Sequence, residues 1–353
     1  MAAPRRLVCL ISLLRAVNGN TNTTLPMGYV CSIGSLPAGL SNTELLYNEL
    51  EAFLAVYRRQ RHAFSSHNEG GNGMFHSFIL WSLLRVIRPV LVVESGVWNG
   101  MTSWLVRQAS AEWRPTFVRI DPLRRGWSDD ERNSSKIFDF RGDDFLDFAS
   151  VDWDTVYRHR GDALVFFDDH MDQLRRLTEA RQLGFGHVVF DDNYVAGVGD
   201  IFSLKNACDG GGRVRKAFTS SGKGPRRCDA FHRKCRGMND ADATAAWEML
   251  QESCEVYWEG PPLAPLTHPY SDIKKFIYGG IYEGPRGRAE WTAKHDKIIK
   301  ESTPTPIFPN MSVAAGRIHG ADLQFEQGRY MHMAYAKLKP PRASQGGQTL
   351  NKF

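Results

Sequence analysis

Apolar and polar positions along the middle of the chain predict short strands and longer helices in alternation. Short apolar runs bounded by Gly, Pro or Asp are typical of strands that are buried on both faces of a parallel sheet. The predicted strands are Leu91–Val93, Thr116–Ile120, Ile137–Phe140, Ala163–Phe167, His187–Phe190, Cys254–Trp258 and Tyr330–Leu338.

Longer segments with apolar residues three and four positions apart predict helices around these strands. Strands that alternate with helices indicate an α/β fold with a doubly wound, mostly parallel, Rossmann-like sheet. The C-terminal strand is expected to close this sheet. The predicted helices are Ser41–Tyr57, Met74–Ile87, Met101–Ser110, Asp152–Arg158, Met171–Leu183 and Ala241–Glu252.

The pattern divides the chain into a leader (1–19), a linker (20–40), one domain (41–340) and a disordered tail (341–353). The leader has a basic start, the apolar stretch Leu7–Leu14 and small residues after it, which predicts a secretory signal peptide and a lumenal or secreted protein. Because no acidic residue precedes Glu44, a transit peptide to a plastid or mitochondrion is the alternative.

Composition narrows the possible partners. Hydrophobic residues make up 42% of the chain and aromatic residues 11%, as in a folded globular protein, and the net charge is only +5. No internal apolar run is long enough for a membrane span. Basic residues gather in an insertion at 195–240, which is either a solvated loop or a surface for an acidic acceptor such as a uronic or sulfated glycan. The insertion lacks the regular aromatic residues that stack on nucleic acid, so we expect no nucleic-acid partner.

Four cysteines lie in and just after the insertion, at positions 208, 228, 235 and 254. In an oxidising compartment they are expected to form two disulfides, whereas the spacing of Cys228 and Cys235 does not favour zinc. N-glycosylation triplets at Asn22, Asn133 and Asn310 fit a lumenal or secreted chain.

The segment VLVVESGVWNG (90–100) joins a strand to a helix through an acid and two glycines. Gly96 and Gly100 would let the backbone turn tightly and approach a ligand. Glu94 stands where a dinucleotide fingerprint has its first glycine, and its charge would repel a pyrophosphate. It suits a cofactor with positive charge and hydroxyl groups, such as S-adenosylmethionine. An ordinary turn is the alternative, and Trp98 in this loop either stacks on the adenine or packs internally.

Four predicted strands end in acidic residues. In an open parallel sheet, ligands bind beyond the carboxyl ends of the strands, so these carboxylates should meet along one edge. Any single acid at such a place can instead cap a helix or turn. The acids are Glu94, Asp121, Asp168 with Asp169, and Asp191 with Asp192.

Residues 91–194 resemble a class I S-adenosylmethionine-dependent methyltransferase, and most closely the small-molecule O-methyltransferases and their cephalosporin-hydroxylase-like and rhamnosyl O-methyltransferase relatives. The segments that carry the resemblance are VVESGVWNGMTSW, VRIDP, RGDDF, VFFDDH and VVFDDNY. The resemblance implies a mostly parallel sheet with an antiparallel C-terminal strand. It also implies a cofactor site in which Asp143 lies beside the adenine and Glu94 and Asp121 hold the ribose, or Glu94 instead binds the charged end of the cofactor through water.

The same resemblance implies that Asp168, Asp192 and Asn193 hold a divalent cation, with Asp191 joining them in the hydroxylase-like relatives. Such oxygen ligands suit Mg²⁺ or a similar ion, which would lower the pKa of a substrate hydroxyl. The lysine that serves as base in the catechol-type enzymes is replaced by Met171. We therefore expect His170 or Asp169 as the base, with an ordinary helix-start role as the alternative for His170.

These observations predict an S-adenosylmethionine-dependent, cation-assisted O-methyltransferase that acts on a hydroxyl of a small molecule or sugar. The first alternative is a non-catalytic protein of the same fold that binds an acidic glycan through the insertion. The second is a nicotinamide-dependent oxidoreductase, which Glu94 disfavours.

Overall fold

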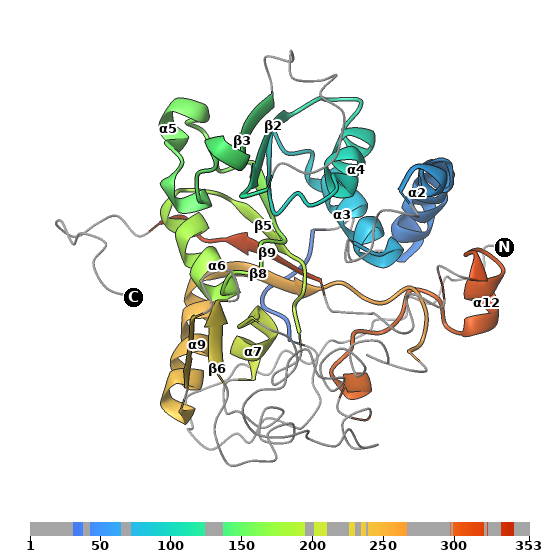
Figure 1. Cartoon of the computed structure of the whole chain (residues 1–353). Coiled ribbons are helices and arrows are strands. Elements are labelled where there is room, and N and C mark those ends of the chain that lie inside the picture. The colour runs from blue at the N-terminus through green and yellow to red at the C-terminus, as the bar shows by residue number, and fades with distance from the viewer. Residues whose placement is uncertain are drawn as a thin grey trace, which may run out of the picture.

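The structure is a computed structural model, and it describes residues 31–37, 43–64, 72–123, 137–194, 201–209, 226–229, 234–237, 239–266, 297, 299–320, 323 and 333–341. Within these ranges a seven-stranded sheet lies at the centre of the molecule (Figure 1), in the order β3-β2-β1-β4-β5-β9-β8. Its strands are β1 (Leu91–Ser95), β2 (Thr116–Asp121), β3 (Ile137–Arg141), β4 (Ala163–Phe167), β5 (His187–Phe190), β8 (Cys254–Glu259) and β9 (Ala334–Leu338).

Strand directions confirm the predicted fold class. Strands β1 to β5 pair in parallel, whereas β9 is antiparallel to both of its neighbours, β5 and β8. The sheet is therefore mostly parallel with an antiparallel C-terminal strand. A separate antiparallel pair, β6 (Arg226–Asp229) with β7 (Lys234–Gly237), lies in the basic insertion and was not predicted.

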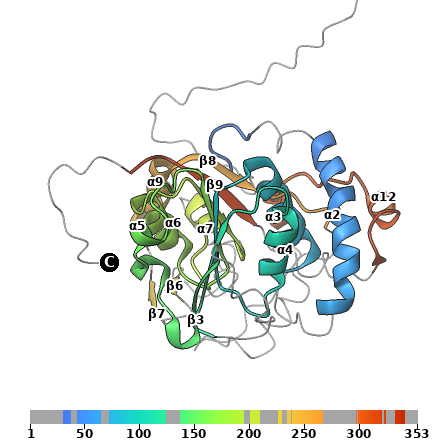
Figure 2. The same cartoon turned by 90° about the horizontal axis from the view of Figure 1, so that it is seen from above.

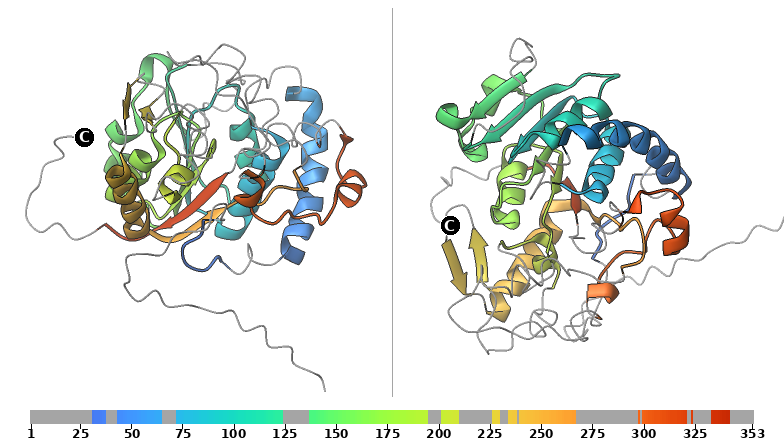
Figure 3. Two further views of the ribbon diagram at one scale, coloured as in Figure 1. Left: turned by 90° about the horizontal axis from the view of Figure 1, so that it is seen from below. Right: turned by 45° about the vertical axis from the view of Figure 1, so that its right-hand side comes forward.

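Helices cover both faces of the sheet (Figure 2), as expected of a doubly wound fold. Seen from below (Figure 3, left), the blue α2 and the brown α9 lie on opposite sides of the red strand β9. One face carries α2 (Thr43–Phe64), α3 (Met74–Ile87), α4 (Met101–Ala109) and α12 (Met311–Ala315), and the other carries α5 (Trp153–Val156), α6 (Gln173–Gln182), α7 (Leu204–Cys208) and α9 (Asp240–Ser253).

Alternate residues of each central strand enter opposite cores. In β1, Val92 packs on the α2–α3–α4 side, while Leu91 and Val93 pack on the α6–α7–α9 side. In β4, Phe166 and Phe167 divide in the same way. Burial on both faces explains why these strands read as uninterrupted apolar runs. None of the helices in the described ranges combines the length and apolar character that a membrane span requires.

The described part of the predicted linker is docked on the domain. Cys31 forms a disulfide with Cys208 of α7, and Ile33 exchanges two backbone hydrogen bonds with Tyr257 of β8. Cys254 is buried with a free thiol. The expectation of two disulfides among the four cysteines at 208–254 was therefore wrong, because proximity in sequence does not report which distant segment folds against α7.

Several predictions fall on residues outside the described ranges. These are the leader, most of the insertion, the tail beyond residue 341, and the triplets at Asn22 and Asn133. The described residues near the start of the predicted insertion do not form a solvated loop, which was one of the two alternatives, since Ile201 to Asp209 are buried apart from the half-buried Asn206. The side chain of Asn310 accepts a hydrogen bond from the Val313 N–H and so caps α12.

Loss of the disulfide should destabilise the fold. It closes a loop between cysteines 177 positions apart. The reduced entropy of the unfolded chain with such a loop stabilises the folded state by up to about 5 kcal/mol. We predict that replacing Cys31 and Cys208 by serine lowers the free energy of unfolding by about 2–5 kcal/mol in a denaturant titration. The control Cys254→Ala removes a buried sulfur without breaking a covalent link. A double variant as stable as the control, or peptide mapping that joins Cys208 to another cysteine, would contradict the assignment.

Candidate functional site

The carboxyl ends of β1, β4 and β5 meet at one edge of the sheet. These strands are adjacent and parallel, and Phe167 pairs with Ser95 on one side and Phe190 on the other. The hydrogen-bond ladder continues past the strands, since the Asp168 N–H donates to the Ser95 carbonyl at 2.7 Å and the Asp191 N–H donates to the Phe167 carbonyl at 3.0 Å. The acids that follow these strands are thereby held side by side, as predicted.

Gly96 connects the glycine loop to the end of β4. Its φ is +92°, and a Cβ at this position would lie 2.1 Å from the carbonyl oxygen of Asp168. No side chain can be placed that close to a backbone oxygen, so glycine is required by contact as well as by conformation. The loop after β1 and the acids after β4 therefore form one connected structure.

Three side chains at this edge can share a cation. Asp168, His170 and Asp192 each offer one ligand atom, and these atoms lie within 4.8 Å of one another. The Nδ1 atom of His170 is 3.7 Å from Oδ2 of Asp192. Asp192 is buried, Asp168 is half-buried and His170 is exposed, so the group opens to solvent on the histidine side. Two of the three predicted cation ligands, Asp168 and Asp192, are brought together here.

Burial and neighbouring negative charges disfavour an ionised Asp168 in this group. Burial raises the pKa of Asp168 well above its ordinary value, and the negative charges of Asp191 and Asp192 raise it further. Like charges held together in a partly desolvated site are relieved by a proton or by a cation. A bound divalent cation would reverse the direction of this shift.

Backbone strain gathers at the same edge. Trp98, His170 and Asp192 have φ values of +47°, +53° and +52°, and they are three of the five non-glycine residues with positive φ in the described ranges. Each follows a different strand, β1, β4 or β5. Left-handed residues other than glycine cost about 1–2 kcal/mol each and persist where the surrounding structure enforces them, which is common at functional sites.

Asp169, one of the two predicted bases, is bound within the protein. Its carboxylate accepts a hydrogen bond from the Ser95 hydroxyl at 2.7 Å and pairs with Arg176 at 2.9 Å. Arg176 also pairs with Asp147, and it is almost completely buried. This arrangement braces the turn after β4 against α6. Met171, which replaces the lysine of the catechol-type enzymes, is 2% exposed and belongs to the core.

Asn193, the third predicted cation ligand, is hydrogen-bonded within the protein at both ends of its side chain. Its Oδ1 accepts a hydrogen bond from the Lys205 N–H at 2.8 Å, and its Nδ2 donates to the Tyr257 hydroxyl at 3.0 Å. The side chain is completely buried, so both of its ends are used inside the protein. His170 takes its place beside the two carboxylates.

The two acids assigned to the ribose are also bonded within the protein. Glu94 is completely buried and accepts a hydrogen bond from the Ser103 hydroxyl of α4, and burial raises its pKa to about 8. Asp121 accepts hydrogen bonds from the N–H groups of Val97 and Trp98 with one oxygen and of Leu123 with the other. Asp121 therefore supports the loop, whereas Glu94 is bonded to α4.

The remaining predicted cofactor residues lie at the surface or shape the loop. Trp98 is 39% exposed, and Asp143 is exposed in the short 3₁₀ turn after β3. Gly100 has a φ of +82° and starts α4. Trp98 and Asp143 are thus accessible to a ligand, whereas Glu94 and Asp121 are buried.

A buried histidine that the sequence analysis did not single out completes the cluster. His76 of α3 places Nδ1 2.5 Å from Oδ1 of Asp191, and the two residues are 4% and 5% exposed. His76 stands in the apolar run MFHSFILW, where the pattern gives no sign of a polar partner. The pair gives Asp191 a partner of its own beside the Asp168–His170–Asp192 group.

Comparisons with known proteins add little to this geometry. No protein-family model matches the chain, and no curated protein does. Among solved structures, one described as "CmcI-N160 apo-structure" matches with 16% identity and a TM-score of 0.27, over 33% of this chain and 52% of that chain. The match thus spans about half of that protein, and it is too weak to carry a functional argument.

The close approach at Gly96 can be tested by adding a single methyl group. We predict that Gly96→Ala lowers the free energy of unfolding by well over the roughly 1–2 kcal/mol that a left-handed alanine costs on its own. Gly184→Ala is the matched control, because Gly184 has a φ of +80° and no atom lies within 4 Å of the place that its Cβ would take. Equal costs in the two variants would show that the contact with Asp168 does not exist.

The buried carboxyl of Glu94 predicts a pH effect. Between its ordinary value of 4.5 and its folded value of about 8, the folded state keeps a proton that the unfolded state releases, so stability from this group falls as the pH rises. We predict that Glu94→Gln gains stability over the wild type between pH 5 and 8, by at most about 1.4 kcal/mol per pH unit. Denaturant titrations at several pH values measure this difference, and parallel curves would contradict it.

Proposed function

We propose that the chain is an S-adenosylmethionine-dependent O-methyltransferase that uses a divalent cation and acts on a hydroxyl group of a small molecule or sugar. One observation carries the proposal. The resemblance assigns the glycine loop to the cofactor, and this loop contacts Asp168 at Gly96. Asp168 in turn belongs to the Asp168–His170–Asp192 group, which could hold a cation. A methyl donor on the loop and a hydroxyl beside the cation would then be neighbours, as methyl transfer requires.

The donor atoms suit a divalent cation. Carboxylates favour Mg²⁺ and Mn²⁺, and an imidazole extends the range to other transition metals. We infer that Asp168, His170 and Asp192 hold the ion, with His170 in the place first expected for Asn193. A cation at this position would act as a Lewis acid on the substrate hydroxyl.

The contacts of Asp169 and His170 favour His170 as the general base. Asp169 is unfavourable, because its carboxylate is already engaged by Ser95 and Arg176. His170 is half exposed beside Asp192 and is the better candidate. A neutral imidazole has one nitrogen with an available lone pair, because the other nitrogen carries the proton, so His170 can accept the substrate's proton only while it is not bound to the cation.

The non-catalytic alternative has one observation in its favour. Both oxygens of Asp121, the acid that the resemblance assigns to the ribose, are occupied by backbone N–H groups. A protein that kept the fold and bound an acidic glycan through its basic insertion would need no ribose contact. The Cys31–Cys208 disulfide supports, for either function, the proposed lumenal or secreted location.

Ligand binding tests the proposal before the acceptor is known. We predict that S-adenosylhomocysteine stabilises the protein against thermal unfolding, by about 2.7 kcal/mol at a concentration of 100 times its Kd.

We also predict that Asp168→Asn and Asp192→Asn weaken Mn²⁺ binding by more than the roughly 10–100-fold that loss of a supporting residue costs. Asp154→Asn is the control, because Asp154 is an exposed acid paired with Arg160.

Methyl transfer from labelled S-adenosylmethionine to catechols, neutral sugars and uronic acids then identifies the acceptor class. Transfer that requires Mn²⁺ or Mg²⁺ and is lost in both aspartate variants supports the enzyme. Binding of an acidic glycan without any response to S-adenosylhomocysteine or Mn²⁺ would favour the non-catalytic alternative.

A further inference from the structure

A closed ring of hydrogen bonds includes Asn193, the residue that follows Asp192. The Asn193 amide donates to the Tyr257 hydroxyl at 3.0 Å, and this hydroxyl donates to Oε1 of Glu259 at 3.0 Å. The other oxygen of Glu259 pairs with the ammonium group of Lys205. The backbone N–H of Lys205 donates to Oδ1 of Asn193 at 2.8 Å, which closes the ring.

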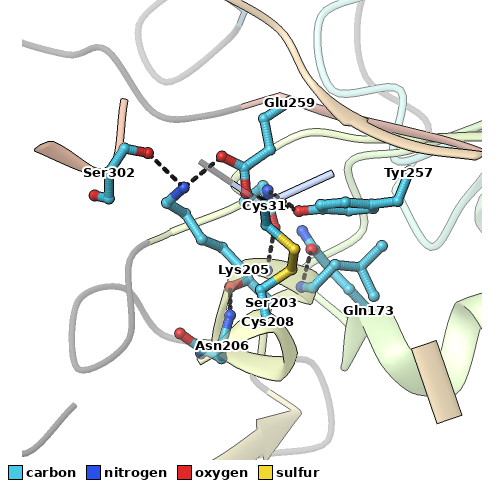
Figure 4. The surroundings of a disulfide bond; sticks show 11 residues. Cys31, Gln173, Ser203, Lys205, Asn206, Cys208, Tyr257, Glu259 and Ser302 are labelled. Carbon is cyan, nitrogen blue, oxygen red and sulfur yellow. Dashed lines mark hydrogen bonds and ion pairs between the residues drawn. A yellow bond between two sulfur atoms is a disulfide. The ribbon is translucent and has the colours of Figure 1, made fainter. Parts of the chain in front are cut away.

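All four members are buried. Asn193 is 0%, Tyr257 1%, Glu259 1% and Lys205 6% exposed. The Lys205 ammonium also donates to the Ser302 carbonyl at 2.8 Å, as Figure 4 shows. A buried ion pair stabilises a fold only weakly, but it imposes one geometry when every partner is satisfied.

The ring joins three separate elements at one point. Asn193 follows β5, Lys205 belongs to α7, and Tyr257 and Glu259 belong to β8. The Cys31–Cys208 disulfide lies beside the ring (Figure 4), and Ile33 pairs with the backbone of Tyr257. The N-terminal segment therefore contacts the elements of the ring through Cys31 and Ile33, in addition to the sheet.

Asp192 needs such support, because its φ of +52° is a conformation that a non-glycine residue adopts only under constraint. Asn193 is its immediate neighbour, and both ends of the Asn193 side chain are fixed by the ring. A fixed Asn193 leaves the preceding residue little freedom to relax. The carboxylate of Asp192 is thereby kept toward Asp168 and His170.

We propose that Asn193, Tyr257, Glu259 and Lys205 form a positioning network that sets the affinity of the Asp168–His170–Asp192 group for its cation. The proposal rests on the proposed function, since it needs a cation at this group. Asn193 then serves the site through backbone geometry instead of through a metal bond. Supporting residues of this kind commonly change metal affinity by about 10–100-fold.

The test is a Mn²⁺ titration of the full chain, with free Mn²⁺ measured by electron paramagnetic resonance, at a temperature well below unfolding. Tyr257→Phe deletes the hydroxyl that links Asn193 to Glu259. Tyr335→Phe is the matched control, because Tyr335 is also fully buried and its hydroxyl contacts His187 at the other end of β5. We expect Tyr257→Phe to weaken Mn²⁺ binding about 10-fold and Tyr335→Phe to leave it within about twofold.

The possible failures are distinguishable. If the wild type binds Mn²⁺ and Tyr257→Phe binds it equally well, or if both tyrosine variants lose affinity alike, the network is refuted and the cation site stands. If the wild type binds no Mn²⁺, both the cation site and the positioning role are refuted. Asn193→Ala provides a second variant, which should weaken binding at least as much as Tyr257→Phe.

Discussion

The contact between Gly96 and the carbonyl of Asp168 is the constraint on which the candidate site depends. Parallel pairing places the ends of β1 and β4 at the same edge, but only a residue without a side chain lets the two backbones touch there. This contact joins the glycine loop after β1 to the Asp168–His170–Asp192 group. Without it, the two features would be unrelated turns at the ends of neighbouring strands.

Several of the acids at this edge have well-defined structural partners. Asp121 supports the loop through backbone N–H groups, Asp169 pairs with Arg176, and Asp191 pairs with His76. Asp168, His170 and Asp192 place their ligand atoms within 4.8 Å of one another. Burial, together with the negative charges of Asp191 and Asp192, raises the pKa of Asp168, and a cation beside these carboxylates would offset both effects.

Sequence patterns predicted the sheet and the edge, because burial on both faces and acids after apolar runs are local signals. They did not predict which acids are engaged, since that depends on partners from distant segments. In the sequence, Arg176 is a polar position of a predicted helix, His76 stands within an apolar helix, and Lys205 belongs to the basic insertion. The pairing of Cys31 with Cys208 was missed for the same reason. The ligand role of Asn193, taken from the resemblance, does not fit a side chain bonded at both ends within the protein.

A crystal structure of the protein soaked with MnCl₂ and S-adenosylhomocysteine is the most direct measurement. The account predicts an anomalous Mn²⁺ peak bound by the carboxylates of Asp168 and Asp192 and a ring nitrogen of His170, with the cofactor analogue against the loop at Gly96. An ion bound elsewhere, or the three side chains turned away from one another with no ion between them, would contradict it.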